Sequence, residues 1–304
     1  MIFERVDRGF NKKYISRDDE IELNKQMSKT MSEIRKSLKT GKCFYCGKTI
    51  SSCCNSHNVP RYCLENIAKN GSVLGPNAIY ELPKMGMAIG KNSPGINESG
   101  TFYLICDECD NTIFKDYENP KNYKEGLIPT QKMLSQIAMK NYLKFIHKRQ
   151  LEIALWEKAY HDLDNRNDPF SYIGRMECAT RLQVSKMDLK EYIKDFERAK
   201  LFSGLVKEPG YHLIYYTLLN YVAPIAIQAP IVISIGLDGE IVNDIFSTDP
   251  DYKINDLHLC VFPQKETTAV LLFVENGDTH HKQFEKDFEK LDDESKIGII
   301  NYFA

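Results

Sequence analysis

The chain has 304 residues, of which 42% are hydrophobic and 27% are charged, and its formal net charge at pH 7 is -2. A chain of this length can bury a sizeable core, and the composition excludes a disordered, collagen-like or low-complexity protein. The longest apolar stretch, residues 221–237, is interrupted by Pro224 and Pro230, so the sequence predicts no helix that crosses a membrane.

Residues 1–40 are predicted to form a charged N-terminal helical arm. Apolar residues between Ile21 and Leu38 recur at three- and four-residue steps, which favours one amphipathic helix. Residues 41–125 differ, because Cys, Gly, Asn and Pro are frequent there and the apolar runs are short. We expect this second segment to be rich in loops and to be held together by something other than a hydrophobic core.

Residues 126–202 are predicted to be a helical connector. An apolar stripe starts at Leu134 and extends to Tyr160, after which the stretch DNRNDPF interrupts the pattern. A separate helix is expected over residues 188–202, with Asp188 as its N-cap.

Residues 203–304 are predicted to be a C-terminal β-rich α+β domain. Runs of β-branched and aromatic residues bounded by Pro, Gly and Asn indicate four strands, at residues 212–219, 231–237, 257–262 and 268–274. Five residues join the last two strands, as in a hairpin, and helical spacing follows over residues 284–303. The whole chain is therefore expected to be an α+β protein.

Charge is distributed unevenly along the chain. Residues 1–42 carry a net charge of +4 and residues 121–202 a net charge of +5, whereas residues 203–304 carry -9. The basic segments could contact a polyanion, while the acidic segment should not. The alternative is that the basic helices present ordinary solvated faces. The best candidates for a phosphate-binding helix face are Lys140, Lys144 and Lys148, at four-residue spacing.

The clearest chemical signal is a pair of Cys-x-x-Cys motifs, CFYC and CDEC, about 60 residues apart. Four thiolates are the ligand set of a closed structural zinc site, and the alternative is two unrelated pairs of buried cysteines. A start without an apolar signal segment and a total of nine cysteines indicate reduced thiols and a cytoplasmic protein. The predicted zinc ligands are Cys43, Cys46, Cys106 and Cys109, whereas Cys53, Cys54 and Cys63 are expected to be core or incidental residues.

Between the two motifs lies the stretch SHNVPR, and the second motif continues as CDECDNTIFKDYE. In these features residues 41–120 resemble the HNH (ββα-metal, treble-clef) endonuclease-like family, as a divergent Ser-His-x-x-Pro branch. The resemblance implies a zinc-pinned treble-clef module followed by the helical connector and the C-terminal domain. In the family, the residue before the catalytic His and a side chain on the helix after the second motif hold the catalytic ion. Ser56 stands at the first of these positions, where members of the family most often have Asp or His.

The resemblance also implies a catalytic site. His57 would be the general base that activates water, and Arg61 would position the phosphate. Asp110 and His57 would together hold a catalytic Mg²⁺ or Mn²⁺, and the carboxylate of Asp110 suits that role. Glu118 lies two helical turns after Asp110 and is expected to add a second carboxylate on a similar helix face.

The expected function is therefore metal-dependent hydrolysis of nucleic-acid phosphodiester bonds, in the setting of prokaryotic phage defence that such branches often share. DNA is favoured over RNA as the partner, and residues 203–304 could bind a protein partner or a second copy. The alternative is a catalytically degenerate zinc-fold protein that acts as a nucleic-acid-binding, protein-binding or sensor module.

Overall fold

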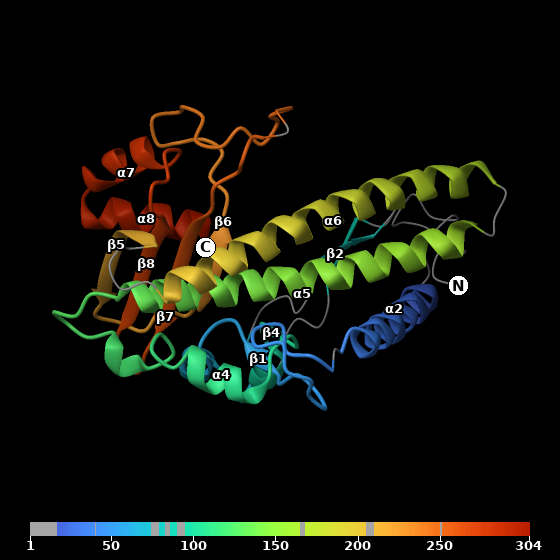
Figure 1. Cartoon of the computed structure of the whole chain (residues 1–304), viewed down its shortest axis with the longest axis horizontal. Helices are drawn as coiled ribbons and strands as arrows, with labels where there is room; N and C mark the ends of the chain where they lie inside the picture. Colours follow the sequence, from blue (N-terminus) through green and yellow to red (C-terminus); the bar gives the residue numbers. More distant parts are fainter. Residues whose placement is uncertain are drawn as a thin grey trace. The chain divides into compact units, whose positions relative to one another are not determined.

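Helices and strands are mixed along the chain, which confirms the predicted α+β class (Figure 1). The computed structural model describes residues 17–39, 41–73, 79–82, 86–89, 95–164, 168–204, 210–249 and 251–304. The helices are α2 (Arg17–Ser37), α3 (Arg61–Ile67), α4 (Asp107–Ile113), α5 (Gln131–Asp164), α6 (Pro169–Ser203), α7 (Lys282–Glu289) and α8 (Asp293–Phe303), with short 3-10 helices η2 (Ile96–Glu98) and η3 (Pro120–Asn122). The strands are β1 (Ser56–His57), β2 (Ile79–Leu82), β3 (Gly86–Ile89), β4 (Thr101–Phe102), β5 (Tyr211–Leu219), β6 (Ile227–Ile231), β7 (Leu257–Pro263) and β8 (Thr268–Glu275).

The chain divides into two compact units, each assembled from separate segments. The first unit draws on residues 1–56, 74–110 and 142–195, and the second on residues 57–73, 111–141 and 196–304. The four consecutive segments expected from the sequence follow chain order, whereas α5 and α6 each contribute to both units.

Two helix contacts build the helical part of the first unit. Met31 and Ile34 of α2 pack against Leu151 and Leu155 of α5, which confirms the predicted amphipathic helix. Residues 1–16 of the predicted N-terminal arm lie outside the described residues. Further along α5, Trp156, Ala159 and Leu163 enclose Cys178 of α6.

The predicted helix start at Asp188 is wrong, because α6 begins at Pro169 and continues without a break to Ser203. Asp188 lies in the middle of this helix, and its carboxylate accepts from Arg149 Nη2 of α5 at 2.7 Å. An aspartate that pairs across two helices has the same local sequence signal as an N-cap, so sequence alone could not separate the two roles.

A four-stranded antiparallel sheet in the order β5-β8-β7-β6 forms the centre of the second unit. The predicted hairpin is confirmed, since Pro263 of β7 pairs with Thr268 of β8. The strand predicted over residues 231–237 is wrong, because β6 ends at Ile231. Pro230 fits within β6 because this strand lies at the sheet edge, where a missing backbone N–H is tolerated.

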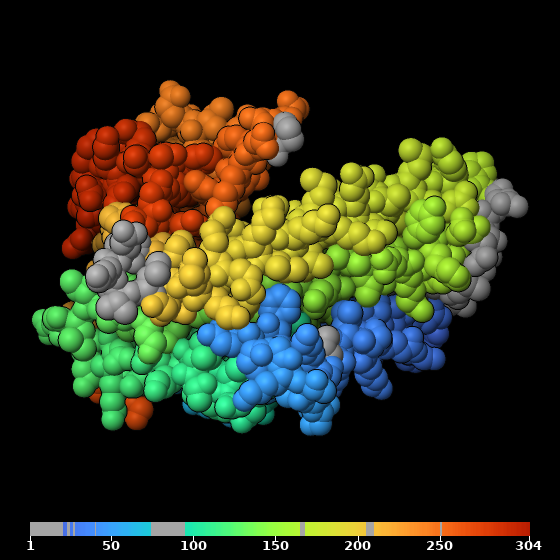
Figure 2. All heavy atoms as spheres, in the orientation of Figure 1, coloured from blue at the N-terminus to red at the C-terminus, as the bar shows by residue number. Residues whose placement is uncertain are grey.

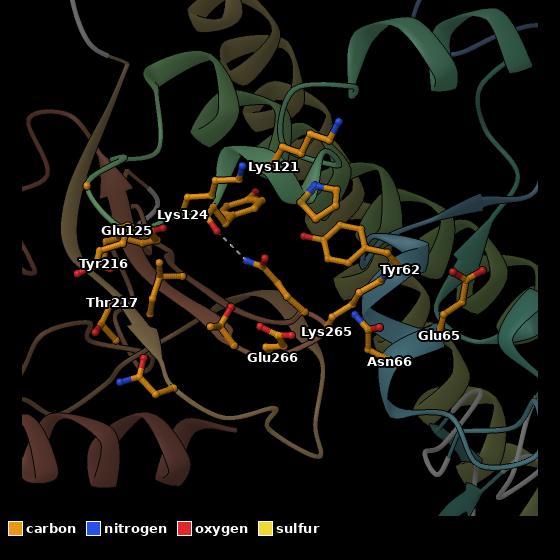
Figure 3. Close-up of a pocket in the computed structure, with 17 residues that line it drawn as sticks. Tyr62, Glu65, Asn66, Lys121, Lys124, Glu125, Tyr216, Thr217, Lys265 and Glu266 are labelled. Atoms are coloured by element: carbon orange, nitrogen blue, oxygen red, sulfur yellow. Dashed lines mark hydrogen bonds between the residues drawn. The ribbon is translucent and has the colours of Figure 1, made fainter.

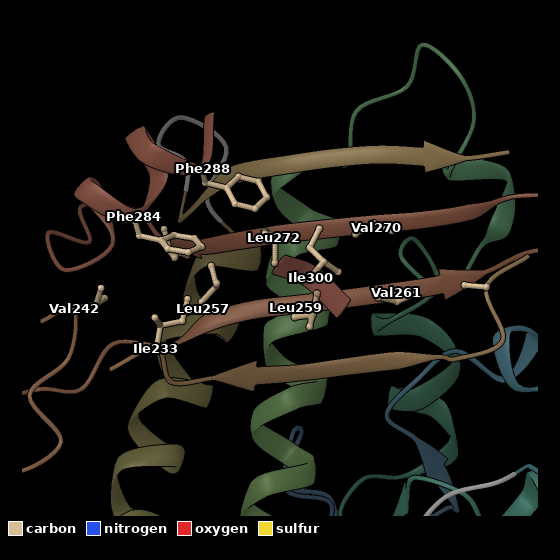
Figure 4. Close-up of a cluster of buried hydrophobic side chains, with 12 residues drawn as sticks. Ile233, Val242, Leu257, Leu259, Val261, Val270, Leu272, Phe284, Phe288 and Ile300 are labelled. Atoms are coloured by element: carbon tan, nitrogen blue, oxygen red, sulfur yellow. The ribbon is translucent and has the colours of Figure 1, made fainter. Parts of the chain in front are cut away.

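Both faces of the sheet are covered within the second unit. On one face, Leu257, Leu259 and Leu272 pack against Phe284 and Phe288 of α7 and against the C-terminal helix (Figure 4). On the other face, Phe262 contacts the rings of Tyr117 and Tyr123. His258 forms a side-chain hydrogen bond with Asn141, the last residue of α5 that belongs to the second unit. Strands buried on both faces read as continuous apolar runs, which is why β7 and β8 were predictable.

The helical spacing expected over residues 284–303 resolves into two helices. The carboxylate of Asp292 accepts from the backbone N–H of Ser295 at 2.8 Å and so caps the start of α8. None of the helices in the described part of the chain combines the length and apolar character that a membrane crossing requires.

Candidate functional site

The two Cys-x-x-Cys motifs come together in the first unit. The sulfur atoms of Cys43, Cys46, Cys106 and Cys109 all lie within 4.8 Å of one another, and those of Cys46 and Cys106 are 3.9 Å apart. Tetrahedral zinc with Zn–S bonds of ~2.3 Å would separate its sulfur ligands by about 3.8 Å. The cluster could therefore hold a metal ion such as zinc, as the motif spacing predicts.

Backbone hydrogen bonds place the first motif against the second. The N–H of Gly47 donates to the Cys43 carbonyl at 2.9 Å. Gly47 has a φ of 71°, a left-handed conformation that glycine adopts without strain. Phe44 N–H donates to the Leu104 carbonyl at 2.8 Å, two residues before the second motif. Cys109 is then carried by the first turn of α4. The four sulfurs are thus positioned by a tight turn and a helix start, which is a rigid arrangement for a ligand set.

Electrostatics around the cluster favour a thiolate at Cys43. Burial alone would raise the pKa of Cys43, but the backbone N–H groups of Cys46 and Cys106 outweigh it and lower the pKa to about 7. The Cys106 N–H lies 3.3 Å from the Cys43 sulfur. Burial raises the pKa of the Cys109 thiol. Because a metal binds the thiolate form, a bound cation must offset this cost of burial for Cys109 to be a ligand. This donor set suits a metal that binds soft sulfur ligands.

The remaining cysteines near the motifs do not join the cluster. In the described ranges, the only group of three or more Cys, His, Asp or Glu residues arranged to hold a metal is the set of four sulfurs. Cys63 is instead a fully buried residue of α3 in the second unit, and burial raises the pKa of its thiol.

Asp110 lies next to the cluster and contacts the residue that precedes His57 in the chain. The hydroxyl of Ser56, at the start of β1, donates to Oδ1 of Asp110 at 2.6 Å. Ser56 is fully buried, whereas Asp110 follows Cys109 on α4 and is partly exposed. The structure therefore brings together the two positions that the family resemblance assigns to metal binding, with a serine in place of one acid.

His57 and Arg61 belong to the second unit. His57 is half-buried, and its backbone carbonyl accepts from Lys140 Nζ at 3.2 Å. Arg61 begins α3 and forms an exposed ion pair with Glu65 at 2.9 Å, one turn further along the helix. An exposed pair of this kind contributes less than about 1 kcal/mol, so the Arg61 guanidinium can exchange Glu65 for another anion at little cost.

The expectation that Glu118 shares a helix with Asp110 is wrong, because α4 ends at Ile113. Glu118 follows in a turn, where its Oε1 atom forms an ion pair with Lys140 Nζ at 3.0 Å and accepts from the Tyr117 hydroxyl at 3.3 Å. Lys140 also lies over the ring of Phe114, 4.5 Å from its centroid. The sequence showed no partner for Lys140, because its contacts come from residues distant in the chain.

The prediction of a phosphate-binding face on α5 is also wrong for two of its three lysines. The side chain of Lys140 is 1% exposed, and Lys144 donates to the Thr101 carbonyl at 2.9 Å. Burial, with a smaller contribution from Arg35, lowers the pKa of Lys144 to about 8. Lys148 remains 46% exposed. Four-residue spacing places lysines on one face of a helix, but it does not tell whether other elements cover that face.

A cavity of about 1040 Å³ opens in the second unit among α3, η3 and the ends of β5 and β7 (Figure 3). Two of its lining residues are joined by a hydrogen bond, which Gln264 Nε2 donates to the carbonyl of Tyr123 at 3.2 Å. Sequence reasoning missed the cavity because its walls come from four distant segments. Its charged lining is balanced, with Lys121, Lys124 and Lys265 facing the same space as Glu65, Glu125 and Glu266.

No protein-family model, curated protein or solved structure matches the chain.

Proposed function

We propose that this protein is a metal-dependent endonuclease with an HNH-like site, in which the cysteine cluster binds structural zinc. The observation that carries the proposal is the 2.6 Å hydrogen bond between Ser56 and Asp110 beside the four sulfurs. In a site of this class, the helix residue after the second motif and the residue before the general base share one divalent ion. A hydroxyl and a carboxylate in contact at these positions are the donor pair that the proposal requires.

The chain's own groups have separate roles in this proposal. The His57 imidazole takes a proton from the attacking water, and its neutral form is the active base. Arg61, which forms an exposed pair with Glu65, turns to the phosphate and forms two parallel hydrogen bonds with it. Asp110 is the carboxylate that holds Mg²⁺ or Mn²⁺, and one carboxylate is sufficient because this ion keeps several waters. When bound, the ion stabilises the charge that develops on the phosphate and on the leaving oxygen.

The test is cleavage of plasmid DNA and of a structured RNA by zinc-loaded protein, with Mg²⁺, with Mn²⁺ and with EDTA. His57→Ala should abolish cleavage while zinc content and thermal melting stay unchanged, since a general base contributes to rate and not to folding. His161→Ala, a change of an exposed histidine on α5, is the matched control and should cleave normally. A wild-type protein that cuts neither substrate, or a His57→Ala variant that cuts as fast as wild type, would refute the proposal.

The alternative is a zinc-fold protein that binds nucleic acid or protein without cleaving it. The same hydrogen bond favours it, because Ser56 already occupies one oxygen of Asp110. Ser56→Asp separates the two functions: a second carboxylate should strengthen Mg²⁺ binding and raise cleavage in a nuclease. In a non-catalytic module, the same change would bring two acids together without a counter-ion and only lower the melting temperature.

A further inference from the structure

The outward face of the first half of α6 almost lacks charge. The exposed positions between residues 170 and 187, all within the described helix, include a single charged residue, Lys186. A surface helix normally turns charged and polar residues outward. This face carries large apolar side chains instead, each more than half exposed: Phe170, Tyr172, Ile173, Met176, Val184 and Met187.

The opposite face of the same helix is already in use. Cys178 is fully buried against α5, and Leu182 joins the same cluster. The exposed apolar residues are therefore not part of the core of the first unit. Figure 2 shows atoms of α6, coloured yellow-green to yellow, on the surface of the molecule. Exposed apolar patches of several hundred Å² mark interaction sites in soluble proteins.

The spacing of the stripe is symmetric about Thr180. Ile173, Met176, Thr180, Val184 and Met187 follow one another at steps of three, four, four and three residues, which keeps them on one side of the helix. When such a helix meets a copy of itself in antiparallel orientation around Thr180, Ile173 faces Met187 and Met176 faces Val184. A contact of this kind is isologous, as a two-fold dimer requires.

The charges beside the stripe are satisfied within the chain. Arg181 pairs with Glu177 at 3.2 Å, Arg175 pairs with Asp164 at 3.2 Å, and Lys186 pairs with Glu157 at 3.0 Å. A nucleic acid or a strongly charged protein would need unpaired charges along this face, whereas an apolar self-contact needs none.

We propose that this protein forms a two-fold dimer through the outward face of α6, with the helices of the two copies antiparallel around Thr180. Aromatic side chains bury on the order of 150–250 Å² each and aliphatic ones less, so the six half-exposed side chains would bury at most roughly 600 Å² per copy. The total of about 1,200 Å² is at the lower end of stable, specific interfaces. This contact lies on a different part of the chain from residues 203–304, the segment favoured by the sequence, and it does not depend on the proposed nuclease activity.

The test is sedimentation velocity from 1 to 100 μM. The wild-type protein should form dimers within this range of concentrations. Ile173→Glu alone should weaken association at least tenfold, because it buries a carboxylate against Met187 of the other copy. Adding Met187→Lys should restore association, since the antiparallel register then places each new acid opposite a new base.

Two controls keep the outcome decisive. Phe246→Glu changes another exposed apolar residue, 86% exposed and outside α6, and should leave association unchanged. Circular dichroism should show equal helix content in all variants, since each replaced residue is exposed. A wild type that stays monomeric at 100 μM, a dimer insensitive to Ile173→Glu, or a double variant weaker than the single one would each overturn the proposal.

Discussion

The ion pair between Lys140 and Glu118 makes a quantitative prediction, because its two partners are buried to different degrees. The Lys140 side chain is 1% exposed, whereas that of Glu118 is 31% exposed. Glu118→Gln removes the counter-charge of a buried ammonium that also contacts the His57 carbonyl and the Phe114 ring, and leaving such a charge costs about 3–5 kcal/mol. Lys140→Met leaves a carboxylate that water can reach, so we expect a cost of about 1–2 kcal/mol.

Urea denaturation at pH 7.5, followed by circular dichroism, measures both costs as changes in the free energy of unfolding. The double variant Lys140→Met/Glu118→Gln should be more stable than Glu118→Gln alone, with a coupling energy of about 1–3 kcal/mol. Lys132 lies on the same helix as Lys140, is 56% exposed and pairs with Asp116, so Lys132→Met should cost less than about 1 kcal/mol. Equal losses for the two single variants, or strict additivity in the double variant, would contradict this reasoning. The same data also separate a stability effect of Glu118→Gln from any loss of cleavage.

Three further predictions follow from contacts described above. Cys43→Ser should lower the zinc content, by elemental analysis, from about one ion per chain and should expose residues 41–73 to limited proteolysis; a zinc-free variant that resists the protease would contradict this. Burial, with a smaller contribution from His281, lowers the pKa of His258 to about 3 from its ordinary 6.5. Its contribution to stability is therefore complete above pH 6.5 and declines as the pH falls toward 3, by about 2 kcal/mol at pH 5. His258→Phe should make urea midpoints at pH 7.5 and 5.0 more alike, and an unchanged difference would assign the acid sensitivity to other groups. Asp292→Ala should cost about 1 kcal/mol of unfolding free energy through loss of the α8 cap, and Asp292→Ser should restore most of it.

Helices and strands with a clear pattern of apolar residues were predictable from the sequence. The residues at which they begin and end depended on contacts with residues distant in the chain. The stripe from Leu134 to Tyr160 identified α5, and the apolar runs of β7 and β8 identified the central strands. Asp188 was assigned to a helix start because nothing near it in the sequence indicates Arg149, its partner on another helix. Prediction also failed at β6, where the apolar run continues past the last paired residue, Ile231.

The residues of the candidate site also fall into two groups, those predictable from a local pattern and those whose contacts come from distant segments. The four cysteines could be predicted to meet because two residues between paired ligands is a spacing that a metal imposes on the local backbone. The contact of Ser56 with Asp110 was expected only through the family resemblance, since no local pattern joins positions so far apart. Lys140 was predicted to lie on the surface, because the pattern of residues along a helix does not show which other segments cover that helix. Its burial depends on Phe114 and Glu118, which come from a different segment.

The separation of the two cysteine motifs has a consequence during synthesis. Cys46 and Cys106 are 60 residues apart in the chain although their sulfur atoms are 3.9 Å apart in the folded unit. A ribosome that adds about 5–20 residues per second needs roughly 3–12 s to proceed from one motif to the other. For that time the nascent chain carries the thiols of Cys43 and Cys46 with only half of their final ligand set. Oxidation or capture of a wrong metal competes with folding during this interval, so expression with low zinc or under oxidative stress should lower the yield of soluble protein more than the same stress applied after folding.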